Sequence, residues 1–430
     1  MAVRKNQAEL SAPEKEKFVQ AVLALKAEKR GNTNTYDQYV REHRDTAPTD
    51  PAIGELSPDY AHAGPAFFPW HREYLLRFEA DLQRIAKDPN LGLPYWDWSV
   101  NQSQYSRWPF TADFMGGDGR DSDGKVMGGR FAYSAGRWTL NIRSSEEPEP
   151  YLRRRFGKDP DVTSLPTQDD VQAALRATPY DVDPWNDKSQ SGFRNIAEGF
   201  IGGPPPPPQQ PPPQQPQMHN RVHVWVGGSM GPMTSPNDPV FFLHHCFVDK
   251  LWADWQVLQP QLGGARDCSL YLPPHGARQG HNLNDSMRIW PDQNVNVQPA
   301  HLLVHHHQLG YRYDTDADMQ FMETLDPGKR LWSWNKKYYL VYQSDGNLEF
   351  YSDTPNRPIW TSETKGQPVG FCTINEYGHL VIYGPNGQTI RAFGGDLGDG
   401  VINDNGRLVV QDDGKVVIYR PDGRAVWTKP

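Results

Sequence analysis

Before residue 260, the hydrophobic residues of the chain follow a helical period. The clearest segment is 71–87, where Leu75, Phe78, Leu82 and Ile85 fall on one stripe. This spacing is typical of an amphipathic helix that packs one face on a core. Three further helices are predicted, over residues 11–30, 219–226 and 237–258.

Two of these helices begin with recognisable capping signals. Ser11 is a suitable N-cap for the first helix. Asn237 or Asp238 can cap the last one, with Pro239 in its first turn, where the missing N–H does no harm. With these helices the first part of the chain is predicted to be mainly α, with long irregular connections such as 99–170.

After about residue 328 the helical period disappears and a degenerate repeat begins. Its copies have alternating apolar residues broken by Asp-Gly, Asn-Gly or Tyr-Gly turns, which is typical of antiparallel hairpins. Tyr351, Tyr383 and Tyr419 align, and each is followed by a further aromatic residue at Trp360, Phe393 or Trp427. The copies span residues 342–360, 374–393 and 410–427. We therefore predict a multidomain protein, with a mainly α domain over 1–328 and a threefold all-β module over 329–430.

The segment "PPPPPQQPPPQQP", residues 204–216, is of low complexity. Such a sequence adopts polyproline II or remains disordered. We interpret it as an insertion that loops out over the surface. The alternative is an arm that docks a partner or a lid.

Composition narrows the class of protein. The chain has 44 basic and 52 acidic residues, a net charge of −8, and no basic run longer than "RRR" at 153–155, which argues against nucleic-acid binding. The three cysteines, Cys246, Cys268 and Cys372, are too scattered for a disulfide framework. Neither an apolar signal region at the N-terminus nor a run of about 20 apolar residues is present, so we expect a protein that is cytoplasmic as synthesised, without a membrane span.

Histidines carry the most specific chemical signal. His219 and His223 stand at i and i+4, so a helix over 219–226 would point both imidazoles the same way, as one metal ion requires. The alternative for this pair alone is two core or surface histidines. Imidazole ligands favour Cu, Zn or Fe, and the zinc-protease pattern is excluded because Asn220 stands where it needs Glu. The remaining histidines of interest lie in or near helices at His43, His62, His71, His244 and His245.

Several motifs together resemble bacterial tyrosinases, above all those of the Streptomyces type. They are "FFPWHREYLLRFE", "LPYWDWS", "HNRVHVWVGG" and "SPNDPVFFLHHCFVDKLWADWQ", and the similarity runs from about residue 2 to 318. The resemblance implies a four-helix-bundle site for two copper ions, a binuclear type 3 centre. By that match, the first copper would be bound by His43, His62 and His71, and the second by His219, His223 and His245. His244 would support a ligand or belong to the core.

The resemblance also implies the chemistry. With O2 as co-substrate, such enzymes hydroxylate monophenols to o-diphenols and oxidise these to o-quinones, the precursors of melanin-type products. Glu198 matches the family glutamate that holds a water to remove the phenol proton, and Asn220 matches the asparagine that helps to orient this water. Val224 and Ser235 match small residues at the substrate entrance.

Alternatives and departures remain at this stage. The same copper site also serves o-aminophenol oxidases, catechol oxidases and the oxygen carrier haemocyanin. The proline-rich insertion lies between Glu198 and Asn220, where the family has a short connection, and Cys246 replaces a small residue beside His245. We interpret the run of histidines at 305–307 as solvated. Streptomyces-type tyrosinases depend on a caddie-type partner for copper loading and export, with which the missing signal peptide is compatible.

The C-terminal repeats resemble bulb-type (mannose-binding) lectins, whose motif is Gln-x-Asp-x-Asn-x-Val-x-Tyr, so a β-prism fold is expected. The first repeat keeps the polar positions but has Glu349 in place of Val. A mannose-type glycan is therefore a candidate ligand at this repeat, through Gln343, Asp345, Asn347 and Tyr351. The alternative is a degenerate lectin fold that serves as a lid or an anchor.

Overall fold

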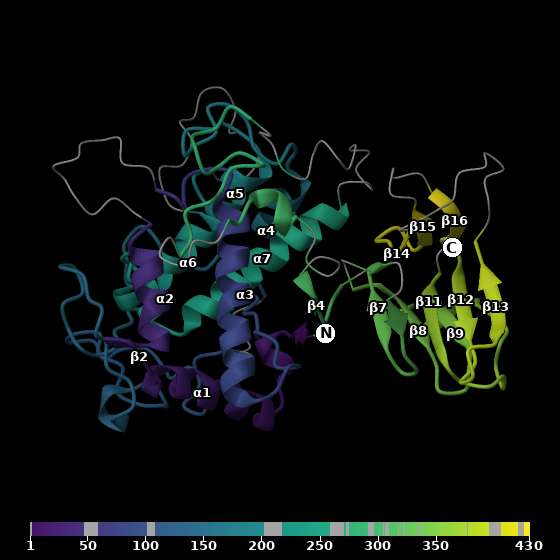
Figure 1. The fold of residues 1–430 in the computed structure, drawn as a ribbon, viewed down its shortest axis with the longest axis horizontal. Helices are drawn as coiled ribbons and strands as arrows, with labels where there is room; N and C mark the ends of the chain where they lie inside the picture. Colours follow the sequence, from purple (N-terminus) through teal and green to yellow (C-terminus); the bar gives the residue numbers. More distant parts are fainter. Residues whose placement is uncertain are drawn as a thin grey trace. The chain divides into compact units, whose positions relative to one another are not determined.

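The fold was analysed in a computed structural model of the whole chain (Figure 1). Contacts divide the chain into two compact units, one formed by residues 1–255 and 269–312 and the other by 256–268 and 313–430. The structure describes residues 2–46, 59–100, 108–201, 217–258, 271, 275–290, 296–303, 305, 309–316, 318–320, 323–333, 336–375, 377–394, 406–419 and 425–430.

The first unit is mainly helical, as predicted. Figure 1 shows α2, α3, α6 and α7 gathered in it. The bounds of its helices are Ala12–Ala27 (α1), Thr35–Arg44 (α2), Phe67–Ala86 (α3), Gln168–Arg176 (α4), Phe193–Glu198 (α5), Met218–Val226 (α6) and Val240–Leu258 (α7). Short strands accompany them at Ala2–Arg4 (β1), Lys29–Arg30 (β2), Thr33–Asn34 (β3) and Tyr311–Tyr313 (β4), where β1 pairs with β4 and β2 with β3.

Local sequence explains where these helices begin and end. Ser11 and Glu14 form a capping box at the start of α1. The predicted end at residue 30 is wrong, because Lys29 and Arg30 leave the helix to pair with Asn34 and Thr33. At the start of α7, the Asp238 side chain accepts the Val240 N–H at 3.1 Å and so provides the predicted cap.

Buried charges bind the ends of the first unit together. Arg4, fully buried, donates to Glu79 at 3.0 Å and to Asp249 at 3.1 Å. Arg72 donates to the other oxygen of Asp249 at 2.5 Å. Removing one partner of such a network leaves an uncompensated buried charge, which costs about 3–5 kcal/mol. Arg154 of the basic run at 153–155 is likewise buried against Asp238, so this residue of the run serves packing.

The second unit is all β, with three four-stranded antiparallel sheets. Each consists of three consecutive strands and one strand from the preceding segment. The sheet orders are β10-β9-β8-β7, β13-β12-β11-β6 and β16-β15-β14-β5. The strands are Asp318–Gln320 (β5), Thr324–Leu325 (β6), Arg330–Trp332 (β7), Tyr338–Tyr342 (β8), Leu348–Ser352 (β9), Arg357–Thr361 (β10), Phe371–Ile374 (β11), Leu380–Tyr383 (β12), Thr389–Phe393 (β13), Arg407–Val410 (β14), Val416–Tyr419 (β15) and Ala425–Lys429 (β16).

The predicted threefold repeat is confirmed in the packing. Trp360, Phe393 and Trp427, one from each repeat, contact one another with ring centroids 5.0, 5.8 and 5.9 Å apart. The boundary between the two units lies at 312/313, earlier than the predicted 328/329. The reason is that β5 and β6 each complete a sheet of the second unit.

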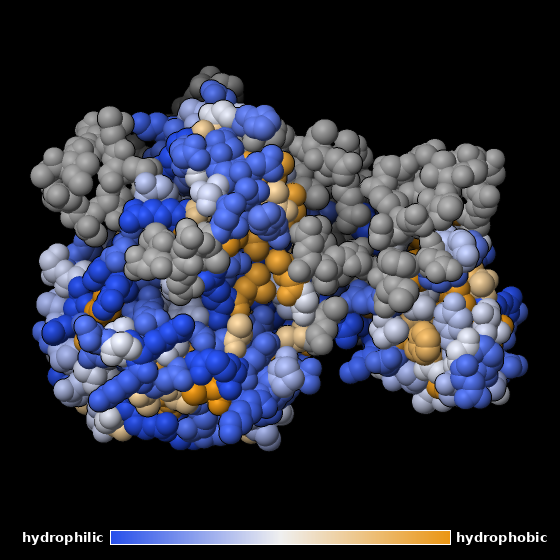
Figure 2. Space-filling view, viewed as in Figure 1, coloured by the Kyte–Doolittle hydropathy of each residue, from blue (hydrophilic) through white to orange (hydrophobic). Residues whose placement is uncertain are grey.

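On the face seen in Figure 2, hydrophilic residues predominate and hydrophobic ones form separate patches. None of the helices in the described ranges combines the length and the hydropathy that a membrane-spanning segment needs.

Candidate metal centre

The first group of histidines joins two helices and a connection. His43 lies in the last turn of α2, His71 in α3, and His62 in the segment that leads into α3. Ring centroids are 5.0 Å apart for His43–His62 and for His62–His71, and 5.8 Å for His43–His71. One nitrogen of each can serve a common metal ion.

The second group joins α6 and α7. His219 and His223 lie one turn apart on α6, as predicted, and His245 lies on α7. Their Nε2 atoms form a triangle with sides of 3.1, 3.2 and 3.3 Å. A metal ion bound to imidazole at about 2.0–2.1 Å can contact all three atoms of such a triangle.

The other ring nitrogen fixes the tautomer of most of these histidines. Nδ1 faces a backbone carbonyl oxygen in three cases: Met233 O for His43, Phe67 O for His71 and Met230 O for His223, at 2.7–2.8 Å. It faces the Asp59 carboxylate in His62, at 3.2 Å, and Asn220 Oδ1 in His219, at 2.9 Å. These oxygens only accept, so Nδ1 carries the proton and Nε2 is left with a bare lone pair.

Burial keeps five of the six imidazoles neutral. It lowers the pKa of His43 to about 3 and that of His223 to about 4, and it lowers the pKa values of His71, His219 and His245 well below the usual range. Nε2 of His43 and of His71 is buried without a hydrogen-bond partner. Bare lone pairs that face one another in a dry site are unfavourable, and a bound cation would compensate them. The donor set and its protonation therefore fit a metal.

The two groups adjoin. The rings of His71 and His245 are stacked with centroids 4.4 Å apart. Phe241, one turn before His245, packs on that ring at 4.0 Å and on His43 at 5.0 Å, so it spans both groups. Two ions held here would be neighbours, which allows one small molecule to contact both.

His244 also lies within reach of the second group. Its Nε2 is buried without a hydrogen-bond partner, but its Nδ1 accepts a hydrogen bond from Trp98 Nε1 at 3.1 Å, and it makes none of the three Nε2 contacts of the triangle. This contact supports the predicted role in the core beside the ligands.

His62 is held by residues that the motifs did not reveal. The Asp59 carboxylate accepts from the His62 N–H and faces its Nδ1. Burial alone would lower the pKa of His62, but this carboxylate raises it above the usual value. The Arg278 guanidinium donates to the carbonyl oxygens of Asp59 and His62. More than 200 positions separate Arg278 from Asp59 and His62, so no local sequence signal could have paired Arg278 with them.

His281 also contacts the segment around His62, at Asp59 and Ala66. It is fully buried, its Nδ1 accepts the Ala66 N–H at 3.3 Å, and its Nε2 lies 3.2 Å from Asp59 O. A Cβ on Gly64 would lie 2.6 Å from this ring, so only glycine allows so close an approach. Segment 59–66 is therefore fixed by a distant loop rather than by a helix of its own.

Glu198 lies at the end of α5, fully buried beside this segment. Its Oε1 accepts the Ala63 N–H at 2.6 Å and its Oε2 accepts from Arg194 at 3.1 Å. Burial raises the pKa of Glu198 to about 7, in spite of Arg194 and His62 nearby. A carboxyl with such a pKa can accept a proton near neutral pH.

The proline-rich insertion does not separate Glu198 from Asn220. It lies outside the described residues, but Gln217 N–H donates to Gly199 O at 3.0 Å directly beside it. Gly199 has φ +108° and a Cβ there would lie 2.0 Å from Gln217 O, so this close approach requires glycine. His219 Nδ1 also lies 3.3 Å from Glu198 O.

The remaining predicted positions have varied surroundings. Val224 is half-buried beside His223, whereas Ser235 is buried in a short 3-10 helix, Ser235–Asn237. Cys246 is buried and donates to Leu93 O at 3.6 Å. The interpretation of a solvated run at 305–307 is wrong for His305, which is 3% exposed and packs on Tyr311.

In the second unit, the structure brings three of the four predicted sugar-binding residues onto one carboxylate. Glu349 accepts from Gln343 at 2.9 Å, from Asn347 at 2.7 Å and from the Tyr351 hydroxyl at 2.5 Å. Asp345 instead accepts the Asn347 N–H at 3.1 Å and lies 3.6 Å from Lys365 Nζ.

A helical domain that presents two adjoining sets of imidazoles, most of them buried and neutral, has the architecture of a protein that holds a pair of metal ions. Comparison with known proteins specifies this class. Residues 33–258 match the model of the common central domain of tyrosinase. The chain is 45% identical over 317 residues to a tyrosinase of Streptomyces glaucescens, which covers 74% of this chain and all of that protein. The chain belongs to the tyrosinase family, whose members are type 3 dicopper oxidoreductases.

Two solved structures are similar to different parts of the chain. A polyphenol oxidase from Thermothelomyces thermophila is 20% identical and covers 73% of this chain and 88% of its own, with a TM-score of 0.48. The snowdrop (Galanthus nivalis) mannose-specific agglutinin is 31% identical and covers 24% of this chain and 89% of its own, with a TM-score of 0.21.

Proposed function

We propose that this protein hydroxylates monophenols to o-diphenols and oxidises o-diphenols to o-quinones, with O2 as co-substrate. His43, His62 and His71 bind one copper ion, and His219, His223 and His245 bind the other. The observation that carries this proposal is the set of bare Nε2 atoms in five of the six histidines, each left unprotonated because Nδ1 faces an acceptor. The copper pair supplies the oxidising chemistry when bound.

The protein's own residues handle the phenol proton. A free phenol has a pKa of about 10, so it binds a metal as phenolate only after a base has removed its proton. Glu198, whose pKa burial raises to about 7, acts as this base through a water molecule. Asn220 orients the water while its Oδ1 holds the His219 N–H. A positioned base of this kind contributes about 10²–10⁴-fold to the rate.

Packing prepares the site for an aromatic substrate. Phe241 and Phe67 line both histidine groups, with Phe67 4.8 Å from His71 and 4.9 Å from His219 between ring centroids. Apolar walls exclude water and strengthen electrostatic interactions inside. Val224, half-buried beside His223, leaves room for the phenol at the entrance.

Oxygen uptake by the copper-loaded full chain tests this function. We expect uptake with L-tyrosine and with L-DOPA. Uptake with L-DOPA alone would contradict the role of Glu198 and Asn220 and favour a catechol oxidase. Faster turnover of o-aminophenol than of either would favour an o-aminophenol oxidase, and reversible O2 binding without turnover would favour an oxygen carrier. The caddie-type copper-loading partner stays a prediction that co-expression can test.

A further inference from the structure

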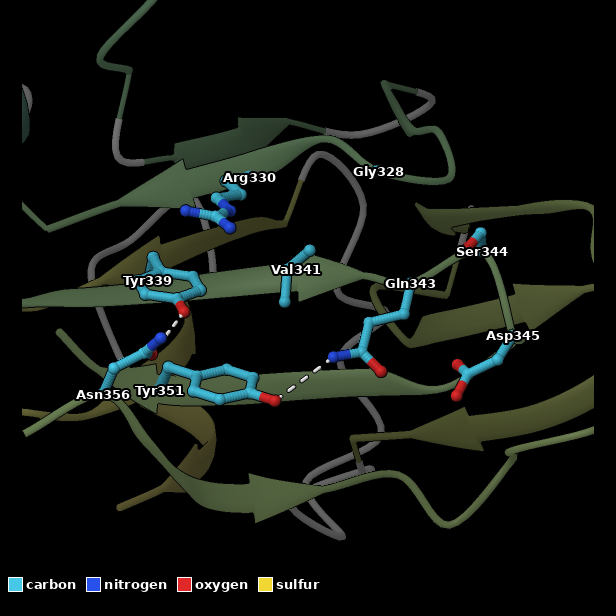
Figure 3. Close-up of a pocket in the computed structure, with 9 residues that line it drawn as sticks. All are labelled: Gly328, Arg330, Tyr339, Val341, Gln343, Ser344, Asp345, Tyr351 and Asn356. Carbon is cyan, nitrogen blue, oxygen red and sulfur yellow. Dashed lines mark hydrogen bonds between the residues drawn. The ribbon is translucent and has the colours of Figure 1, made fainter.

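A pocket of about 430 Å³ opens on the outer face of the sheet formed by β7, β8 and β9 (Figure 3). This volume lies within the range of about 300–1,000 Å³ that small-molecule sites occupy. Its side chains come from three strands and the turns that join them. Those that matter here are Arg330, Tyr339, Val341, Gln343, Asp345 and Asn356.

Strand register arranges this face in rows. Arg330 pairs with Val341, and Val341 pairs with Glu349, so a cation and an anion flank an aliphatic side chain. In the next row Tyr339 pairs with Tyr351, and their rings are parallel with centroids 5.0 Å apart. The pocket thus offers an apolar floor between two groups of opposite charge.

At one side of this apolar floor, the side-chain hydrogen-bond donors already bind Glu349. The Glu349 carboxylate takes the amides of Gln343 and Asn347 and the hydroxyl of Tyr351. A neutral sugar hydroxyl that bound these donors would have to displace a charged acceptor, and hydrogen bonds to ionised groups are about twice as strong as neutral ones. Glu349 therefore closes this part of the site to neutral hexoses.

At the other side, Arg330 is exposed and oriented. Its guanidinium carbon lies 4.5 Å from the centroid of the Tyr339 ring, which limits its freedom. Within the described ranges it makes no ion pair with a carboxylate, since Asp345 faces Lys365 and Glu349 is held by its three donors. An oriented guanidinium is suited to bidentate recognition of a carboxylate.

We propose that this pocket binds a carboxylate-bearing saccharide, a uronic acid. Its carboxylate pairs with Arg330, its C–H face covers Val341, and its hydroxyls donate to Asp345 and Gln343 at one end and meet Asn356 at the other (Figure 3). Glu349 determines the specificity by excluding neutral mannosides. This proposal is independent of the proposed oxidase activity.

Calorimetric titration of the full chain with α-1,4-trigalacturonate tests the site. Its fully methyl-esterified form is the matched neutral control, and the net charge of −8 disfavours unspecific attraction of an anion. We expect binding of the acid but not of the ester, and a loss of at least about tenfold in affinity in Arg330→Ala. Arg357→Ala, on β10 and outside the pocket, is the control variant and should leave binding unchanged.

Equal binding of acid and ester, equal affinities of the two arginine variants, or no binding of the acid would overturn the proposal. The role of Glu349 has its own test. Glu349→Val should bind methyl α-mannoside where the unaltered chain does not. The same result for both chains, whether binding or none, would contradict the exclusion by Glu349.

Discussion

The histidine centre of the first unit and the pocket of the second unit treat their polar groups in opposite ways. In the histidine centre, Nε2 atoms of His43 and His71 are buried without a partner. In the pocket, the side-chain donors predicted to bind a sugar, those of Gln343, Asn347 and Tyr351, already donate to Glu349. A buried polar group without a partner costs about 1–3 kcal/mol, so a fold keeps several of them together only where a ligand compensates them. The histidine centre therefore requires a ligand, whereas the pocket leaves only the exposed Arg330 for one.

The largest expected effect comes from removing a bare nitrogen from the histidine centre. His245→Ala should lose one of two copper ions per chain and essentially all oxygen uptake, because the triangle of Nε2 atoms loses a corner. Copper analysis of the purified variant measures this. His244→Asn is the matched control, since its amide can still accept from Trp98, and it should keep both ions. Loss of copper in both variants would contradict the assignment of His245 as a ligand and of His244 as a core residue.

A second variant separates metal binding from proton transfer. Glu198→Gln should keep both copper ions and the oxidation of L-DOPA, but lose about 10²–10⁴-fold in the rate with L-tyrosine. The amide cannot accept the phenol proton, yet it can still accept the Ala63 N–H. Oxygen uptake with both substrates, alongside copper analysis, measures the split. An equal loss with both substrates would assign Glu198 a purely structural role.

A third variant addresses the support of His62. Arg278→Ala should weaken copper binding at the first group about 10–100-fold, as is usual when a partner that orients a ligand is lost, and leave the second group occupied. Competition with a graded chelator, with EPR to detect an isolated copper(II), measures this. Arg278→Lys should restore part of the affinity. Arg143→Ala is the control, since among the described residues its guanidinium donates only to the Pro148 carbonyl.

The smallest effect is on the stability of the copper-free protein. Burial holds the pKa values of His43 and His281 at about 3 and that of His223 at about 4, below about 6.5 in the unfolded chain. Their contribution to stability is complete above about pH 6.5 and is lost as the pH falls, by up to about 1.4 kcal/mol per pH unit for each.

Two carboxyls act in the opposite direction. Burial raises the pKa values of Glu42 and Glu198 to about 7, so their contribution is present at low pH and is lost as the pH rises through 7. The buried histidines outnumber them, so we expect a lower Tm at pH 5 than at pH 7 in thermal unfolding without copper. A Tm that is equal or higher at pH 5 would contradict the assigned neutral histidines.

The sequence predicted what depends on local pattern. The helical period located α3, and the spacing of His219 and His223 indicated α6. The alignment of Trp360, Phe393 and Trp427 indicated the threefold repeat, in which the three rings contact one another. The end of α1 and the short strands β5 and β6 were missed, because pairing with distant segments decides them.

The site shows the same limit. His219 and His223 could be paired from spacing alone, and the full set of proposed ligands came from the resemblance. Arg278 and His281 could not be found, since their contacts with segment 59–66 arise only in the folded chain. Glu349 was visible as a departure from a motif, but only its three contacts reveal what the departure does.

The most direct test of the central claim is the copper content of the full chain together with its EPR intensity. Because the two histidine groups adjoin, with His71 and His245 stacked at 4.4 Å, we predict two copper ions per chain whose spins couple, so that the oxidised protein gives little EPR signal. One copper per chain, or two with the full intensity of isolated copper(II), would contradict the account.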